Sequence, residues 1–119
     1  AHARLCSILR QAQEQGYVVE APVSRDDLLR LDSQEERDLL KKLADLPGEI
    51  ALAARLMEPH RLARYVLDLA SLFHSFYNSH RVLVEDEQLR NARLALVRAT
   101  KQVLANVLRI LGVTAPERM

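Results

Sequence analysis

The sequence of 119 residues predicts a single all-α domain, a bundle of about five helices. Apolar side chains recur every three or four residues along most of the chain, which is the spacing of one face of a helix. Residues that commonly begin and end helices flank these segments, and only three Gly and four Pro interrupt the sequence. The valine pair at 18–19 is the only candidate for a strand. With 49% hydrophobic residues, a chain of this length can bury a core of its own.

The first predicted helix covers residues 2–15, where apolar positions follow helical spacing. Gly16 comes next, and glycine readily takes the left-handed conformation that often ends a helix. Residues 17–32 predict a connection that contains a short helical turn. Ser33 and Glu36 then have the spacing of a capping box, in which each side chain bonds the backbone of the other residue. A second helix is therefore expected to begin here.

Two prolines indicate where the next helices begin. Proline lacks a backbone N–H and is tolerated in the first turn of a helix, where that N–H would have no partner. Pro47 therefore predicts a third helix over residues 46–57, and Pro59 predicts a fourth over residues 58–82. The apolar residues of the fourth helix that should face the core are Leu62, Leu69, Phe73 and Phe76.

The last predicted helix covers residues 86–111 and stops at Gly112. Its apolar arc takes up about half of the circumference, which is more than an ordinary surface helix shows, so we expect this helix at the centre of the bundle. The arc includes a seven-residue repeat formed by Leu89, Leu96, Val103 and Ile110. Arg93 and Thr100 interrupt it, and a buried guanidinium needs a partner. Asp68 is the candidate partner, and the alternative is an Arg93 head group in water above a buried stem.

Charge alone argues nothing about RNA, but the motifs exclude several classes of function. Seventeen Lys and Arg against 16 Asp and Glu give a net charge of +1, well short of the basic excess typical of nucleic-acid-binding domains. The sequence contains no phosphate-binding loop, no dinucleotide-binding motif and no serine elbow. Its four His and single Cys6 lack the paired spacing of a tetrahedral metal site. We therefore expect neither a metal site nor a complete enzyme within these residues.

The apolar runs are much shorter than the roughly 20 residues that span a bilayer. Cys6 cannot form an internal disulfide, which fits a reducing compartment. We therefore expect a soluble, cytoplasmic protein. Because the chain begins at Ala1 in a helical pattern and without an initiator Met, we expect residues 1–119 to be one domain of a longer polypeptide.

Most of the aromatic residues gather in one segment, FHSFYNSHRVLVED at residues 73–86. His74, Tyr77 and Arg81 fall on one flank of the predicted fourth helix. An exposed Tyr beside an Arg suits single-stranded RNA, because a base can stack on the ring while the guanidinium holds a phosphate or a base edge. Alternatively, Tyr77 packs on the bundle with its hydroxyl in water, and His74 and Arg81 form a solvated face. Periodicity alone favours this alternative.

Three stretches of the sequence resemble a known family. AHARLCSIL at the start, LARYVLDLASLFHSFYNSHRVL in the middle and LRNARLALVRATKQVLANVLRILGVTAPERM at the end occur in the same order in the C-terminal, DALR-type anticodon-binding domain of arginyl-tRNA synthetases. The resemblance covers essentially the whole chain, and residues 16–57 are its least distinctive part. It implies an all-helical domain of the type found in class Ia synthetases.

The resemblance also implies a function. Such a domain grips the anticodon loop of arginine tRNA, while a separate class I catalytic domain uses ATP and Mg²⁺ to activate arginine and esterify the tRNA. That catalytic domain is absent from this chain, so we expect tRNA binding without catalysis and no cofactor in this domain. The expected partners are arginine tRNA and the catalytic domain of the same polypeptide; we expect no membrane association and a monomer.

The residues that the resemblance places at the anticodon are Arg4, Ser7, Tyr77 and Met119. Tyr77 would stack a base flipped out of the loop, and Arg4 and Ser7, three residues apart, could meet the same nucleotide. The terminal Met119 would offer a flexible thioether to a ribose or a base. Asn78 and Arg81 are added from helical geometry. The competing hypothesis is a helical protein-interaction module that docks a partner helix on residues 73–81 and has no role with RNA.

Overall fold

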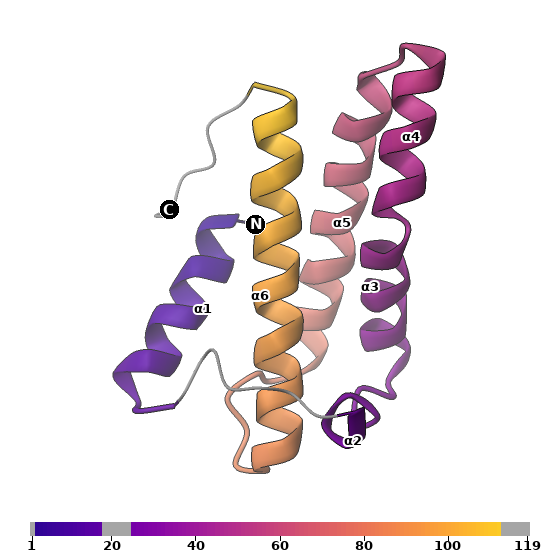
Figure 1. Ribbon diagram of the computed structural model, residues 1–119. Helices are drawn as coiled ribbons and strands as arrows, with labels where there is room; N and C mark the ends of the chain where they lie inside the picture. The colour runs from indigo at the N-terminus through magenta and orange to yellow at the C-terminus, as the bar shows by residue number, and fades with distance from the viewer. Residues whose placement is uncertain (1, 18–24, 113–119) are drawn as a thin grey trace.

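The structure, a computed structural model, describes residues 2–17 and 25–112. The strand candidate at 18–19 and the predicted contact residue Met119 lie outside these residues. Within them the chain forms helices and no strand (Figure 1). The helices are α1 (His2–Glu14), α2 (Arg25–Leu28), α3 (Gln34–Ala44), α4 (Leu46–Leu56), α5 (His60–Ser79) and α6 (Glu87–Ile110). The five long helices confirm the predicted all-α bundle, and α2 is the short turn expected in the first connection.

The boundaries follow the capping residues that the sequence indicates. Ser33 and Glu36 form both hydrogen bonds of the capping box at the start of α3. Gly16 has a φ of +84°, and the N–H of Tyr17 donates to the carbonyl of Ala12 at 3.0 Å, so α1 ends in the left-handed closure expected there. Asp86 caps α6 by accepting from the N–H of Leu89 at 3.3 Å.

One boundary was predicted wrongly. The fourth predicted helix was expected to reach residue 82, but α5 ends at Ser79 and His80 is extended, with φ −138° and ψ 141°. The backbone leaves the helix where the His80 side chain makes tertiary contacts, described below. Arg81 therefore lies beyond the helix and not on the flank of α5 with His74 and Tyr77.

The helices are arranged around α6, as the width of its apolar arc predicts. α6 packs against α1, α2, α3 and α5, and α5 packs in turn against α3 and α4 (Figure 1). α1 lies on one side of α6, and the pair formed by α3 and α4 lies beyond α5 (Figure 1). The result is an elongated bundle of 46 × 29 × 25 Å. No described helix is both long enough and apolar enough to cross a bilayer.

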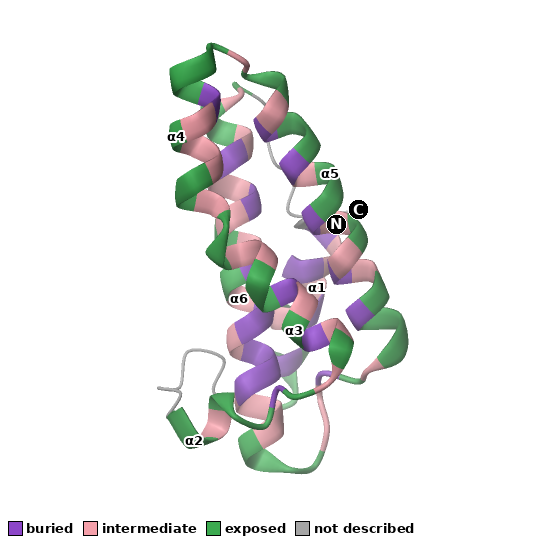
Figure 2. Ribbon diagram, turned by 90° about the vertical axis from the view of Figure 1, so that its right-hand side faces the viewer, coloured by how far each residue is buried: buried purple, intermediate pink, exposed green. Residues whose placement is uncertain are grey.

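The core runs along the inner faces of α1, α5 and α6 (Figure 2). Its largest fully buried side chains are aromatic and come from α5, namely Tyr65, Phe73 and Phe76. Each of the four α5 residues expected to face the core is buried, which confirms the period assigned to that helix.

The seven-residue repeat of α6 describes the core less well. Leu96 is buried, but Leu89 and Val103 are only partly buried and Ile110 is 57% exposed. A straight helix has 3.6 residues per turn, so positions seven apart drift about 20° per repeat and leave the core after a few turns. The buried line of α6 instead follows Ala92, Leu96, Val97, Leu104 and Val107.

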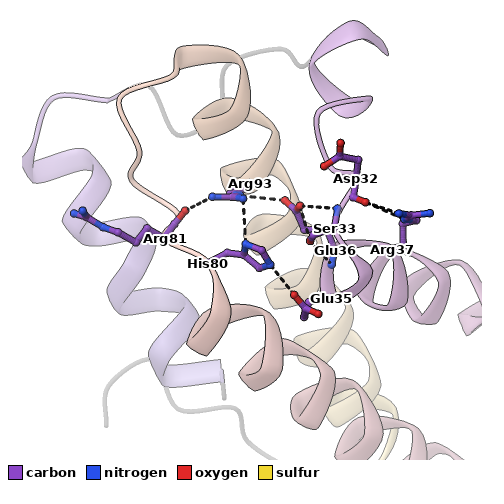
Figure 3. A network of polar contacts seen from close by, with 8 residues as sticks. All are labelled: Asp32, Ser33, Glu35, Glu36, Arg37, His80, Arg81 and Arg93. Carbon is purple, nitrogen blue, oxygen red and sulfur yellow. Dashed lines mark hydrogen bonds and ion pairs between the residues drawn. The ribbon is translucent and has the colours of Figure 1, made fainter.

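Arg93 has a different partner from the one predicted, and its head group is not in water. It is 8% exposed and its Nε lies 3.0 Å from Oε2 of Glu36, which is 1% exposed (Figure 3). Asp68 pairs with Lys42 at 3.6 Å instead. Thr100 is fully buried, and its hydroxyl donates to the carbonyl of Leu96 at 2.8 Å, so the second polar residue of the arc is satisfied within its own helix.

The drift of the repeat predicts a contrast between two α6 variants. Leu104→Ala should lower the free energy of unfolding by about 2–5 kcal/mol, because it leaves a cavity in the core. Ile110→Ala removes a mostly exposed side chain and should cost less than about 1 kcal/mol. Urea unfolding of both variants measures the difference. Equal losses would contradict this placement of Ile110.

Candidate functional site

The candidate site is centred on Tyr77, which α5 presents at the surface next to α1. Tyr77 is 38% exposed. The guanidinium carbon of Arg4, on the first turn of α1, lies 4.9 Å from the centroid of the Tyr77 ring, within the range of a cation–π contact. Two residues that are 73 positions apart in the sequence thus form one surface.

Aromatic side chains support Tyr77 from within α5. The Phe73 ring, fully buried, lies 6.1 Å from the Tyr77 ring between centroids, at an angle of 36°. His74 is half-buried and lies 6.1 Å from the same Phe73 ring. Burial lowers the pKa of His74, and the positive charge of Arg4 acts in the same direction. His74 is therefore an uncharged neighbour at neutral pH, and the positive charge beside Tyr77 comes from Arg4.

A groove of about 260 Å³ opens beside Tyr77, between α1 and the segment that follows α5. The lining residues are Ile8, Gln11, Tyr77, His80, Arg81, Val82 and Leu83. The groove therefore combines one exposed aromatic ring, apolar walls, and amide, imidazole and guanidinium groups. Its volume is just below the range of roughly 300–1,000 Å³ for small-ligand pockets, which suits a single planar group.

The structure brings some of the predicted contact residues together. Arg4 touches Tyr77, and Tyr77 and Arg81 line the same groove. Ser7 lies one turn after Arg4, but its hydroxyl donates to the carbonyl of Ala3 at 3.1 Å, so its oxygen is left mainly as an acceptor. Asn78 is exposed next to Tyr77 and does not line the groove.

The groove also includes residues that sequence reasoning did not select. Ile8 and Gln11 follow Arg4 by four and seven positions, so they lie on the same face of α1, and a helical wheel drawn from Arg4 could have found them. The sequence indicates no role for His80, which is one of the four histidines that lack metal-site spacing. No local pattern indicates that it ends α5 and forms part of the groove wall, because both depend on contacts with α3 and α6.

A second groove lies at the other end of α5, where α4, α5 and α6 meet. Its volume is about 410 Å³, and the described residues that line it are all apolar: Ile50, Ala53, Ala54, Met57, Pro59, Leu62 and Ile110. It offers no side chain that could bind a charged or hydrogen-bonding ligand. Among the described residues, no group of His, Cys, Asp and Glu could hold a metal ion.

Comparison with known proteins gives a consistent set of matches. The family profile described as the DALR anticodon binding domain matches residues 1–119. The chain is 75% identical over 119 residues to an arginine–tRNA ligase of Desulfitobacterium hafniense, and 58% identical to one of Caldanaerobacter subterraneus subsp. tengcongensis. Each match covers all of this chain and 21% of the relative, so the chain spans about a fifth of the length of these curated relatives.

A solved structure has the same fold. The arginyl-tRNA synthetase of Thermus thermophilus matches 99% of this chain and 20% of its own chain, with a TM-score of 0.82 and 37% sequence identity. The sequence and structure comparisons therefore point to the same family over nearly the whole chain.

The environment of His74 predicts its titration. Its pKa should lie below the ordinary value of about 6.5, and Arg4→Gln should raise it part of the way back, because burial remains the larger cause. Because the pKa of His74 is lower in the folded chain, the unfolded chain binds a proton on this ring more readily. His74 therefore lowers the free energy of unfolding as the pH falls below about 6.5. NMR titration of the histidine ring protons measures both values. A pKa of 6.5 or more in the unsubstituted chain would contradict the assignment.

Proposed function

This chain belongs to the DALR anticodon binding domain family, as the anticodon-binding domain of an arginyl-tRNA synthetase, and we propose that it binds the anticodon loop of arginine tRNA. In this proposal the domain positions the tRNA for aminoacylation by a class I catalytic domain outside these 119 residues. ATP and Mg²⁺ would bind in that domain, and this chain alone would not be catalytic. We also propose that the protein is cytoplasmic and monomeric.

The observation that supports RNA binding most directly is the exposed Tyr77 ring at the edge of the groove. A base extruded from a single-stranded loop can stack on an exposed aromatic ring, and the stacking is worth about 1–3 kcal/mol. Phe73 supports the ring from the core side, so the ring is held in place before a ligand arrives. A base stacked there would enter a groove whose polar groups can bond to its edge.

The neighbouring residues have distinct proposed roles. Arg4 stands against the Tyr77 ring, and its guanidinium could turn to a phosphate or stack on the incoming base. Arg81 and Gln11 line the groove and could bond to a base edge. Ser7 could accept a hydrogen bond from a ribose hydroxyl, and the exposed Asn78 could reach the next nucleotide.

The proposed role of Met119 rests on the family resemblance alone. The thioether of this C-terminal residue would contact the ribose or the base that stacks on Tyr77.

The proposal predicts selective and salt-dependent binding. This chain should hold arginine tRNA more tightly than a tRNA with another anticodon in filter-binding titrations. The net charge is only +1, so few phosphates should be neutralised. If Arg4 and Arg81 supply the two cations, the plot of log affinity against log salt should have a slope of about −1.4. Weak and equal binding of both tRNAs would favour the helical protein-interaction module instead.

The role of Tyr77 predicts how two variants differ. Tyr77→Ala should weaken the binding of arginine tRNA by about 1–3 kcal/mol, because the stacking platform is lost. Tyr77→Phe keeps the ring and should bind nearly as tightly as the unsubstituted chain. Neither variant should greatly change the melting temperature, since Tyr77 is more than a third exposed. Tyr77→Ala with full affinity would remove Tyr77 from the binding site.

A further inference from the structure

A buried arginine on α6 connects α3 to the wall of the groove. The guanidinium of Arg93 donates in three directions (Figure 3). Its Nε bonds Oε2 of Glu36 at 3.0 Å, its Nη1 bonds the backbone carbonyl of Arg81 at 2.7 Å, and its Nη2 lies 3.3 Å from Nδ1 of His80. Two of these three partners, His80 and Arg81, line the groove beside Tyr77.

One end of this connection is fixed in α3. Oε1 of Glu36 accepts from the hydroxyl of Ser33 at 2.7 Å and from its N–H at 3.2 Å, while Oε2 accepts from Arg93. The carboxylate that holds Arg93 is therefore itself held by the capping box of α3. A hydrogen bond between two charged groups is roughly twice as strong as a neutral one.

The other end fixes the segment that follows α5. The His80 ring stacks on Phe76, with 5.9 Å between centroids, and its Nε2 lies 2.8 Å from Oε1 of Glu35. Arginine has donors only, so Nδ1 of His80 must accept the bond from Arg93, and the ring proton must be on Nε2, where it is donated to Glu35. Beyond His80 the chain has left α5, and the carbonyl of Arg81 receives its bond from Arg93.

We propose that Arg93 is a positioning residue for nucleotide recognition. Arg93 holds the His80 ring and the Arg81 carbonyl in position. It thereby fixes the wall of the groove and the direction in which the Arg81 side chain leaves the backbone. In Figure 3 that side chain extends away from Arg93 while its carbonyl points toward it. This inference rests on the proposed function of the groove.

A role in stability alone accounts poorly for these contacts. Replacing a buried ion pair by apolar residues of similar size is often neutral or stabilising, because two charges no longer need to be removed from water. What apolar residues cannot supply is a directed bond to the Arg81 carbonyl and to one nitrogen of His80. Supporting groups of this kind, outside the contact surface, keep binding side chains within the narrow geometry that recognition needs.

The test compares a double variant with a destabilised control. Glu36→Gln together with Arg93→Met removes both charges and keeps the capping box, in which glutamine can replace glutamate. This variant should remain helical by circular dichroism and bind arginine tRNA about tenfold more weakly, a loss typical of removing a supporting partner in metal sites. The control is Leu104→Ala, which lowers stability from the same helix without lining the groove, and it should bind as the unsubstituted chain does below its melting temperature.

A second measurement needs no tRNA. Long-range ¹H–¹⁵N NMR of the His80 ring should show the Nε2–H form in the unsubstituted chain, with an Nδ1 signal that shifts in the double variant and stays in place in Leu104→Ala. A proton on Nδ1 in the unsubstituted chain would overturn the inference. The inference would also be overturned if the double variant bound arginine tRNA as tightly as the unsubstituted chain does, provided that the unsubstituted chain prefers arginine tRNA to a tRNA with another anticodon. Failure of the unsubstituted chain to prefer arginine tRNA would overturn the proposed function, and this inference with it.

Discussion

The ion pair between Glu36 and Arg93 is the interaction on which the connection between α3, α6 and the segment after α5 depends. Both side chains are buried, and removing such charges from water costs several kcal/mol for each ion. The cost is offset because Ser33 holds the carboxylate, and because the Arg81 carbonyl and the His80 ring receive bonds from the guanidinium. These bonds are directional, so they fix α3, α6 and the segment after α5 relative to one another.

The binding surface depends on this arrangement because it is assembled from separate elements. α1 contributes Arg4, Ile8 and Gln11, whereas α5 and the segment after it contribute Tyr77 and Arg81. Both sides pack on the central α6. With a net charge of only +1, the domain cannot rely on long-range attraction to RNA. Recognition in the proposed function therefore depends on stacking and on the shape of the groove.

Much of the candidate site was predictable, and the remainder shows where local patterns fail. Tyr77 and Arg4 were identified from the family resemblance, and their contact gives that pair a geometric basis. Gln11 could have been added from helical spacing alone. His80 could not, because it ends α5 through contacts with Glu35 and Arg93, which are 45 and 13 positions away. The actual partner of Arg93, Glu36, is 57 positions away in the sequence, so no local pattern indicates it, and the choice of Asp68 on the neighbouring predicted helix was wrong.

The sequence by itself determined the all-helical class, the positions of most helix ends and the core face of α5. Each of these depends on residues within a few positions of one another, through hydrogen bonds to nearby backbone and the 3.6-residue period. Tertiary structure alone decided which charges are buried together, where α5 stops and which elements meet to form the groove. Those features depend on side chains that meet only after the helices have packed, and no spacing along the chain encodes that meeting.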